Sequence, residues 1–371
     1  MSDGRRSAHM STSPFLTPGQ SRERRALAAQ RRRRRRMAGA ATAIVVLLAV
    51  VIAAVGVTGS SKGVRRGGPP AGVRGRTQTA SAPALSPAGL VLAKPAFALP
   101  GIETPRQSPI RVAFHAPPRA GLLFNLTSGQ VLWQRNAHRR LPVASLTKMM
   151  TALIAVHAAP PSAPVLVTKQ AIASGGSKVG VLPLGRHVRL ESLLYGLMLP
   201  SGNDAAIAIA QHVAGGVSQF VARMNQEAAG LGMGCTRYSS PSGFYDRGNF
   251  SCAADLAVLA HVDEAQTRIM RVAHTYSAVI PFPIKGGKLY LYNNNPLLIY
   301  HYPGTTGLKT GWTLAAGRCL VATAERDGVK LGVVLLNSPN PGTQARQLLD
   351  RGFKTAYHLK PVFEPPIPPG T

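Results

Sequence analysis

Hydrophobic and polar positions follow different patterns along the chain, and the changes divide it into segments. Residues 38–58 are apolar or small and carry no charge, over a length that can cross a bilayer. Further on, the apolar runs 121–125 and 130–135 are separated by Thr127-Ser128-Gly129, which predicts a β-hairpin. Stretches rich in leucine, methionine and alanine then predict helices over 145–157, 191–199, 204–213, 217–231 and 254–261.

The last third of the chain has a different pattern. Short β-type runs cover 308–312, 318–325 and 330–336, and Asp327-Gly328 supplies a turn between the last two. A closing helix is expected over 344–357. Strands at both ends of this region with helices between them predict an α+β domain.

The flanks of this region do not have the pattern of a folded domain. Residues 1–37 hold eleven arginines against two acidic residues, and Arg31–Arg36 lie directly before the apolar span. This order predicts a basic cytoplasmic segment and an exported remainder, with 38–58 either an uncleaved anchor or a cleaved signal peptide. Residues 59–106, rich in Gly, Pro and Ala, are expected to be a linker, and 358–371 a Pro-rich tail. The folded domain is therefore expected over 107–357.

The formal net charge of +29 raises the question of a nucleic-acid partner. The longest basic run, Arg31–Arg36, lies beside the expected membrane span and has no interleaved aromatic residues for base stacking. We therefore assign this run to contact with lipid headgroups at the cytoplasmic membrane, and we expect no nucleic-acid partner.

Three short motifs at wide spacing carry the candidate chemistry. They are Ser145-Leu146-Thr147-Lys148, Ser201-Gly202-Asn203 and Lys309-Thr310-Gly311. Each alone is common, as a helix start, a turn or an edge strand. In this order they form the signature of serine β-lactamases and penicillin-binding proteins.

The first two motifs supply a nucleophile and its proton acceptors. Ser145 and Lys148 are three apart, so on a helix they share a face. Lys148 can accept the serine proton only as a neutral amine, so burial and a second ammonium, Lys309, are expected to lower its pKa. Ser201 is expected to relay the proton to the leaving amine, and Asn203 to hold the substrate amide.

The third motif is expected to bind the substrate. Lys309 would supply a fixed positive charge and Thr310 a hydroxyl group for a substrate carboxylate. Gly311 would let the substrate backbone approach the strand closely. The N–H groups of Trp312 and Ser145 would form an oxyanion hole.

The three cysteines, Cys235, Cys252 and Cys319, leave two alternatives open. Cys235 and Cys252 could form a disulfide, or all three could be separate buried thiols. There is no C-x-x-C or H-E-x-x-H motif, and the ten histidines show no ligand clustering in the sequence. We therefore expect no metal and no cofactor.

Longer stretches around the motifs resemble a known family, the low-molecular-mass penicillin-binding proteins of the D-alanyl-D-alanine carboxypeptidase type. The resemblance covers about residues 109–357. It is carried by the stretches ASLTKMMTALIA, LMLPSGNDAAIAIA, PSGFYDRGNFSCAADLAVLA and GLKTGWTLAAGRCLVATAERDG.

This resemblance implies a transpeptidase/β-lactamase-like α/β fold, with an antiparallel sheet, a helical subdomain and Ser145 at the N-terminus of a central helix. It implies that Ser145 attacks the penultimate D-Ala carbonyl of a peptidoglycan stem peptide, and that β-lactams acylate the same serine. Six positions match the family motifs: Ser145, Lys148, Ser201, Asn203, Lys309 and Thr310. Two features depart from it. The chain ends soon after the closing helix, so the N-terminal span would replace a C-terminal anchor, and Trp312 stands where some relatives have His.

Other functions remain open at this point. A β-lactamase needs a base for fast deacylation, but Glu191 and Glu227 lie in expected helices, and neither is in a loop that would face Ser145. A D,D-endopeptidase could use the same residues. A non-enzymatic reading is a membrane-tethered module that binds or senses the wall. The sequence leaves the oligomeric state open.

Overall fold

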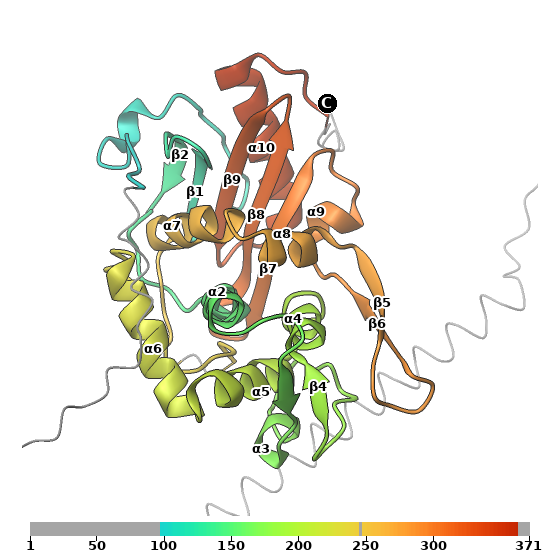
Figure 1. Ribbon diagram of the computed structural model, residues 1–371. Helices are drawn as coiled ribbons and strands as arrows, with labels where there is room; N and C mark the ends of the chain where they lie inside the picture. Colours follow the sequence, from blue (N-terminus) through green and yellow to red (C-terminus); the bar gives the residue numbers. More distant parts are fainter. Residues whose placement is uncertain (1–96, 245–246, 363–371) are drawn as a thin grey trace, which may run out of the picture. The chain divides into compact units, whose positions relative to one another are not determined.

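A computed structural model describes residues 97–362 apart from 245 and 246 (Figure 1). The expected cytoplasmic segment, membrane span, most of the linker and most of the tail lie outside these residues. Within 97–362, no single helix is both long and apolar enough to cross a bilayer. Helices α5 (Asn203–Ala214) and α6 (Val217–Gly230) reach that length only as a pair bent by 85°.

The core element is a five-stranded sheet in which every neighbouring pair is antiparallel, in the order β2-β1-β9-β8-β7. The first strand in the chain, β1, therefore pairs directly with the last strand, β9. The strands are β1 (Ala120–Asn125), β2 (Val131–Arg135), β7 (Thr305–Thr313), β8 (Gly317–Arg326) and β9 (Val329–Leu336).

Period-two alternation gives this sheet two apolar faces. Leu123 and Val333 are paired across β1 and β9, and both belong to the cluster that packs on α10 (Pro341–Tyr357). Their chain neighbours Leu122 and Val334 point the other way, into the larger core with the remaining helices. In Figure 1, α10 lies behind the sheet and α7 and α8 cross in front of it. Both faces are therefore covered.

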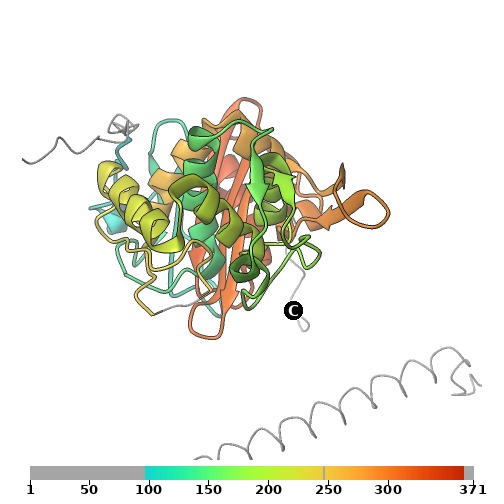
Figure 2. The same ribbon diagram turned by 60° about the horizontal axis from the view of Figure 1, so that its bottom comes forward.

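The larger core is completed by helices around α2, which is buried along almost its whole length. This central helix, α2, covers Lys148–Ala158. The other major helices, besides α5, α6 and α10, are α4 (Leu190–Met198), α7 (Ala253–Glu264) and α8 (Thr267–His274). The short elements are η1 (Pro105–Gln107), η2 (Ala144–Thr147), α3 (Lys169–Ile172), α9 (Pro296–Ile299), β3 (Pro164–Leu166), β4 (His187–Arg189), β5 (Ser277–Pro281) and β6 (Lys288–Tyr292). The β5–β6 hairpin extends away from the body of the fold (Figure 2).

The predicted hairpin, the central helices, the three late strands and the closing helix are all present. Several element boundaries differ from the sequence prediction by about three residues, and two differences bear on the site and on the extent of the domain. The α-helix expected from Ser145 begins at Lys148, after the 3₁₀ turn η2. Residues 97–106, assigned to the linker, pack on the domain: Phe97 stacks on the His261 ring at 3.8 Å, and Ile102 contacts the core. Apolar residues within a Pro- and Gly-rich stretch explain this difference.

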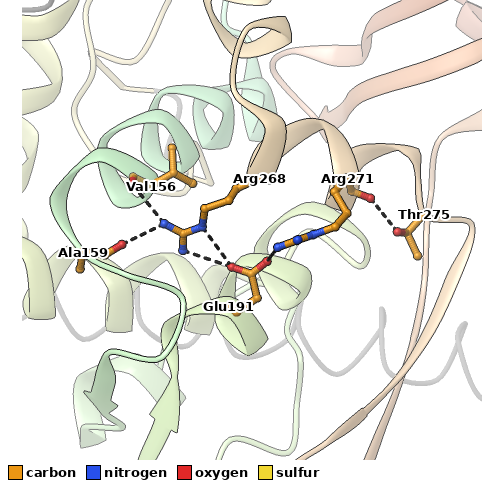
Figure 3. Close-up of polar contacts among 6 residues, drawn as sticks. All are labelled: Val156, Ala159, Glu191, Arg268, Arg271 and Thr275. Carbon is orange, nitrogen blue, oxygen red and sulfur yellow. Dashed lines mark hydrogen bonds and ion pairs between the residues drawn. The ribbon is translucent and has the colours of Figure 1, made fainter.

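An ion-pair cluster joins three helices of the larger core (Figure 3). Glu191 at the start of α4 contacts Arg268 at 3.1 Å and Arg271 at 2.6 Å, both on α8. Arg268 also donates to the carbonyl oxygens of Val156 and Ala159 at the end of α2. Glu191 thus pairs with two guanidinium groups and orients Arg268, which binds the end of α2.

We expect Glu191→Gln to destabilise the fold by about 1–3 kcal/mol, because it leaves the partly buried Arg268 without its counter-charge. The cost stays below that of a fully buried pair because Arg271 is 56% exposed. Urea unfolding measures the change. The matched control is Glu325→Gln, which removes a more exposed partner of Lys330 and should cost less than about 1 kcal/mol. Equal costs for the two variants would contradict the assigned role of Glu191.

Candidate active site

The first motif lies where η2 meets the edge strand β7. Ala144 has a positive φ of 49°, which turns the chain into η2 and brings Ser145 to the surface of a cleft. A Cβ atom on Gly311 would lie 2.8 Å from the Val143 carbonyl oxygen and 3.1 Å from the Ser145 backbone nitrogen. Gly311 therefore lets η2 itself approach the strand. The expected close approach involves the protein's own backbone and places Ser145 against the third motif.

Lys148 is fully buried directly behind Ser145. Its Nζ lies 2.9 Å from Ser145 Oγ, 2.7 Å from Asn203 Oδ1 and 2.7 Å from the carbonyl oxygen of Ser242. These three contacts come from three separate segments of the chain. The first and second motifs are thus joined through one nitrogen atom, a contact that the sequence does not indicate.

The surroundings of this amine favour its neutral form. Burial lowers the pKa of Lys148 well below its usual value, and the nearby Lys309 lowers it further, whereas Asp204 opposes the change. A neutral amine has two N–H donors and one lone pair. The oxygens of Asn203 and Ser242 can accept the two donors, which leaves the lone pair for the hydroxyl group of Ser145.

Asn203 and its neighbour Asp204 are held by a loop over residues 175–180. Asn203 Nδ2 donates to the Gly175 carbonyl oxygen at 2.6 Å, which fixes the orientation of its amide. Asp204 accepts hydrogen bonds from the backbone N–H groups of Val179 and Gly180. Both ends of the Asn203 side chain are therefore engaged within the protein. It was predicted to hold the substrate amide, and here it holds the Lys148 amine.

Ser201 has an unusual backbone conformation and a buried hydroxyl group without a hydrogen-bond partner among the described residues. Its backbone has a φ of 67°, which is unusual for a residue with a side chain. It lines the cleft at 5% exposure, and its Oγ has no hydrogen-bond partner among the described residues. An unsatisfied buried hydroxyl group is costly, so a substrate that supplies its partner would be favoured.

Lys309 is buried next to this site, and Thr310 beside it lines the cleft. Burial lowers the pKa of Lys309 to about 7. The fixed positive charge expected from the sequence is therefore only partial near neutral pH. An anionic substrate group would stabilise the charged form and raise this pKa.

The buried Lys309 makes stability depend on pH. Its pKa is about 7 in the folded protein against 10.5 when solvated, so between these values the unfolded chain binds more protons and stability rises with pH. We expect Lys309→Met to remove this contribution, so that its stability rises less from pH 7 to about pH 9 than that of the unaltered protein. Urea unfolding at several pH values measures both slopes. Equal slopes would contradict the lowered pKa.

Two hollows meet at Ser145 and Trp312. One, of about 380 Å³, extends past Ser201, Thr310 and Arg318. The other, of about 700 Å³, is lined by Asn203, Phe244 and Leu314 among others. Trp312 lines both hollows and is 63% exposed. A bound chain could enter from either side of the serine.

Several site residues were missed by sequence reasoning. Ser242 contributes a backbone oxygen, which no side-chain pattern marks. Its position follows from Gly243, which has a positive φ of 71° and lies so close to Ala144 that no side chain fits. Ser177 and Phe244 also line the cleft. The stretch PSGFYDRGNF, which contains Ser242, carries part of the family resemblance, but its residue types indicate no role for the Ser242 backbone.

The cysteines are neither bonded nor all separate. None of the three forms a disulfide among the described residues, so the Cys235–Cys252 bond is not formed. However, the sulfur atoms of Cys235 and Cys252 and a ring nitrogen of His138 all lie within 4.8 Å of one another. One histidine thus lies beside two cysteines in the fold, although the histidines show no clustering in the sequence. Tertiary folding brings His138 to two cysteines about a hundred residues away in the chain.

Known proteins similar to this chain are D-alanyl-D-alanine carboxypeptidases and related transpeptidases. The sequence profile of the D-alanyl-D-alanine carboxypeptidase family matches residues 111–340. The chain is 31% identical over 254 residues to D-alanyl-D-alanine carboxypeptidase DacF of Bacillus subtilis, covering 66% of this chain and 64% of that protein. It is 36% identical over 245 residues to DacB2 of Mycobacterium tuberculosis, covering 64% of this chain and 82% of the relative.

Solved structures show the same fold. A mutant of the Streptomyces K15 DD-transpeptidase superposes with a TM-score of 0.61 at 30% identity, covering 65% of this chain and 99% of that chain. The D-alanyl-D-alanine carboxypeptidase of Mycobacterium tuberculosis gives 0.62 at 32% identity, covering 70% and 97%. The match to DacF spans less than two thirds of that protein's length. The described residues thus have the mixed α/β transpeptidase-like fold with an antiparallel sheet.

Proposed function

Because the chain belongs to the D-alanyl-D-alanine carboxypeptidase family, we propose that it removes the terminal D-alanine from peptidoglycan stem pentapeptides through an acyl-enzyme on Ser145. The observation that carries this proposal is the 2.9 Å contact between Ser145 Oγ and a buried lysine amine. This contact pairs a nucleophile with a base that needs no metal ion.

The first step is acylation. Neutral Lys148 accepts the proton of Ser145 as Oγ attacks the carbonyl carbon of the penultimate D-Ala. The backbone N–H groups of Ser145 and Trp312 are assigned to the developing oxyanion. Ser201, whose hydroxyl group has no other partner among the described residues, passes a proton to the leaving amine of D-alanine.

The third motif orients the substrate. Lys309 and Thr310 are assigned to the carboxylate of the terminal D-alanine, and this anion would bring the partial charge of Lys309 to a full one. Gly311 keeps this strand close to Ser145. Lys148 is neutral again once its proton has passed through Ser201 to the leaving amine. Water then attacks the acyl-enzyme, Lys148 takes a proton from this water and passes it to Ser145 Oγ, and the shortened stem leaves as its carboxylic acid.

The acidic residues favour a slow deacylation of penicilloyl-enzyme over β-lactamase activity. Glu191 is bound to two arginines on α8 (Figure 3). Glu227 pairs with Arg223 on α6. Neither carboxylate lines the hollows at Ser145. β-Lactams are therefore proposed as inhibitors that leave a lasting adduct.

A second candidate uses the same acyl-enzyme with another acceptor. The hollow beside Phe244 and Leu314, about 700 Å³, has room for a second peptide strand on the far side of Ser145. An amine from such a strand would give transpeptidation, and a crosslinked donor would give D,D-endopeptidase activity. This hollow is the observation that favours both alternatives.

We further propose that residues 38–58 anchor the chain in the cytoplasmic membrane, with the catalytic domain outside the cytoplasm. The arginine block before the apolar run supports this orientation. So does the proposed substrate, which lies outside the membrane. A protease added to intact cells should therefore degrade the domain. Protection of the domain that is lost only when the cells are lysed would contradict this orientation.

Two measurements test the proposed function. Incubation with benzylpenicillin should add one penicilloyl mass that maps to the Ser145 peptide and persists for minutes to hours. A peptide ending in D-Ala-D-Ala should release free D-alanine. Turnover of penicillin within seconds would instead identify a β-lactamase, and neither acylation nor release would identify a binding module.

A further inference from the structure

A cluster of soft ligands lies outside the active-site cleft. Three side chains converge there, and their ligand atoms all lie within 4.8 Å of one another: one ring nitrogen of His138 and the sulfur atoms of Cys235 and Cys252. None of the three lines the hollows at Ser145. The proposed peptidase chemistry makes no use of them.

The three side chains come from segments that the backbone already holds together. Leu141, just after His138, forms an isolated antiparallel bridge with Ser251, just before Cys252. Ala254 donates its N–H to the Ala137 carbonyl oxygen at 3.1 Å. Arg140 donates to the carbonyl oxygen of Gly234, which directly precedes Cys235. The convergence therefore follows from the fold and does not depend on side-chain rotamers alone.

A carboxylate beside the sulfurs adds negative charge. Asp255, in the first turn of α7, accepts hydrogen bonds from the Cys235 N–H at 2.8 Å and from the Thr236 hydroxyl group at 2.6 Å. Among the described residues, no lysine or arginine forms an ion pair with its carboxylate within 4.0 Å. A cation at this place would find a compensating charge.

We propose that His138, Cys235 and Cys252 form a binding site for a thiophilic divalent metal ion, Zn²⁺ being the best match. Nitrogen and sulfur are its preferred ligands, and around a tetrahedral ion such atoms lie about 3.5–3.8 Å apart. The observed cluster needs to contract by only about 1 Å. On binding, the two thiols release their protons to solvent and the sulfurs coordinate as thiolates.

The surroundings allow entry and orientation of the ion. Cys252 is fully buried, Cys235 is half-buried, and the His138 side chain is 54% exposed, so the site opens to solvent on the imidazole side. His138 Nε2 lies 3.5 Å from Glu103 Oε1, so this carboxylate could support the ring when Nδ1 coordinates. A carboxylate on the second ring nitrogen is the usual support of a metal-bound histidine.

A disulfide is the competing use of the two cysteines. It would join the same sulfurs, but these are unbonded, and it would leave the converging imidazole without a role. The metal site accounts for all three groups. It would also close the 235–252 segment, which carries the Ser242 oxygen that contacts Lys148.

Zinc binding to the full chain, purified in detergent without a polyhistidine tag, tests this proposal. We expect one Zn²⁺ per chain by elemental analysis, and a thiolate-to-metal charge-transfer band when Co²⁺ replaces it. His138→Ala and Cys252→Ser should each weaken Zn²⁺ binding at least about 100-fold, since even loss of a supporting group costs 10–100-fold. His138 is exposed, so its variant should fold normally.

Matched controls use residues of the same types outside the cluster. Cys319→Ser and His187→Ala should keep the full metal content. Unchanged Zn²⁺ affinity in His138→Ala, or equal losses in the controls, would overturn the site. So would an intact mass lacking two hydrogens, which identifies a Cys235–Cys252 disulfide, or a metal content well below one per chain with free thiols. None of these readouts depends on peptidase activity, so the proposed function can stand or fall separately.

Discussion

Ser145→Ala should abolish both penicillin acylation and D-alanine release, with a fall in turnover of about 10⁴–10⁶-fold. The substitution removes the cleft hydroxyl group whose oxygen lies 2.9 Å from the Lys148 amine. Without it no covalent intermediate forms, and the remaining groups can act only on bound water. Intact-mass spectrometry after penicillin treatment and a D-alanine assay measure the two losses.

The fold should survive this change. Ser145 is half-buried in a 3₁₀ turn, and alanine removes one oxygen without creating a large cavity. Binding of a D-Ala-D-Ala peptide should persist, because Lys309, Thr310 and Trp312 remain. The matched control is Ser177→Ala, another cleft serine, which should still be acylated. A penicilloyl adduct on Ser145→Ala would show that the nucleophile is elsewhere.

Lys148→Met should slow acylation about 10²–10⁴-fold while the affinity for the substrate stays near that of the unaltered protein. Methionine keeps the apolar stem of the lysine and removes the amine that accepts the Ser145 proton. The two oxygens that contact this amine, from Asn203 and Ser242, would lose a donor. Rapid-mixing kinetics with a fluorescent penicillin separate the acylation rate from the dissociation constant.

The pH dependence distinguishes a base from a structural amine. In the unaltered protein the acylation rate should rise with pH as Lys148 loses its proton, and this rise should begin well below the usual lysine pKa because burial lowers it. The variant should lack this limb. Lys169→Met, on the surface helix α3, is the control and should keep the rate and the profile. An unchanged acylation rate in Lys148→Met would assign the base elsewhere.

Much of the site could be predicted because it rests on side-chain types in order along the chain. Ser145, Lys148 and Ser201 lie together as the motifs indicate. The partner that the sequence could not indicate is the Ser242 carbonyl oxygen, since every residue carries one and only the tertiary path selects it. The partial charge of Lys309 was missed for a related reason: it depends on burial by residues from distant segments.

Parts of the fold were missed for other reasons. The β5–β6 hairpin was not predicted, although β6 has the alternating pattern of a strand. Its Leu289 and Leu291 are buried between exposed residues. The α8 helix begins at Thr267, and the preceding Gln266 makes no side-chain capping hydrogen bond, which leaves the start unmarked in the sequence. His138 could not be linked to Cys235 and Cys252, because loop contacts between distant segments bring them together.

The amine of Lys148, which contacts Ser145, Asn203 and Ser242, determines how the protein loses activity on heating. Its low basicity depends on the loop that ends in Gly243, which is held by hydrogen bonds from the Lys148 and Thr151 side chains and not by a ladder of backbone hydrogen bonds like the strands of the sheet. If the loop opens, water reaches the amine, which then takes up a proton and can no longer accept one from the serine. Catalysis would stop while the five strands are still paired. Inactivation should therefore precede melting, as a local protonation event that cooling reverses.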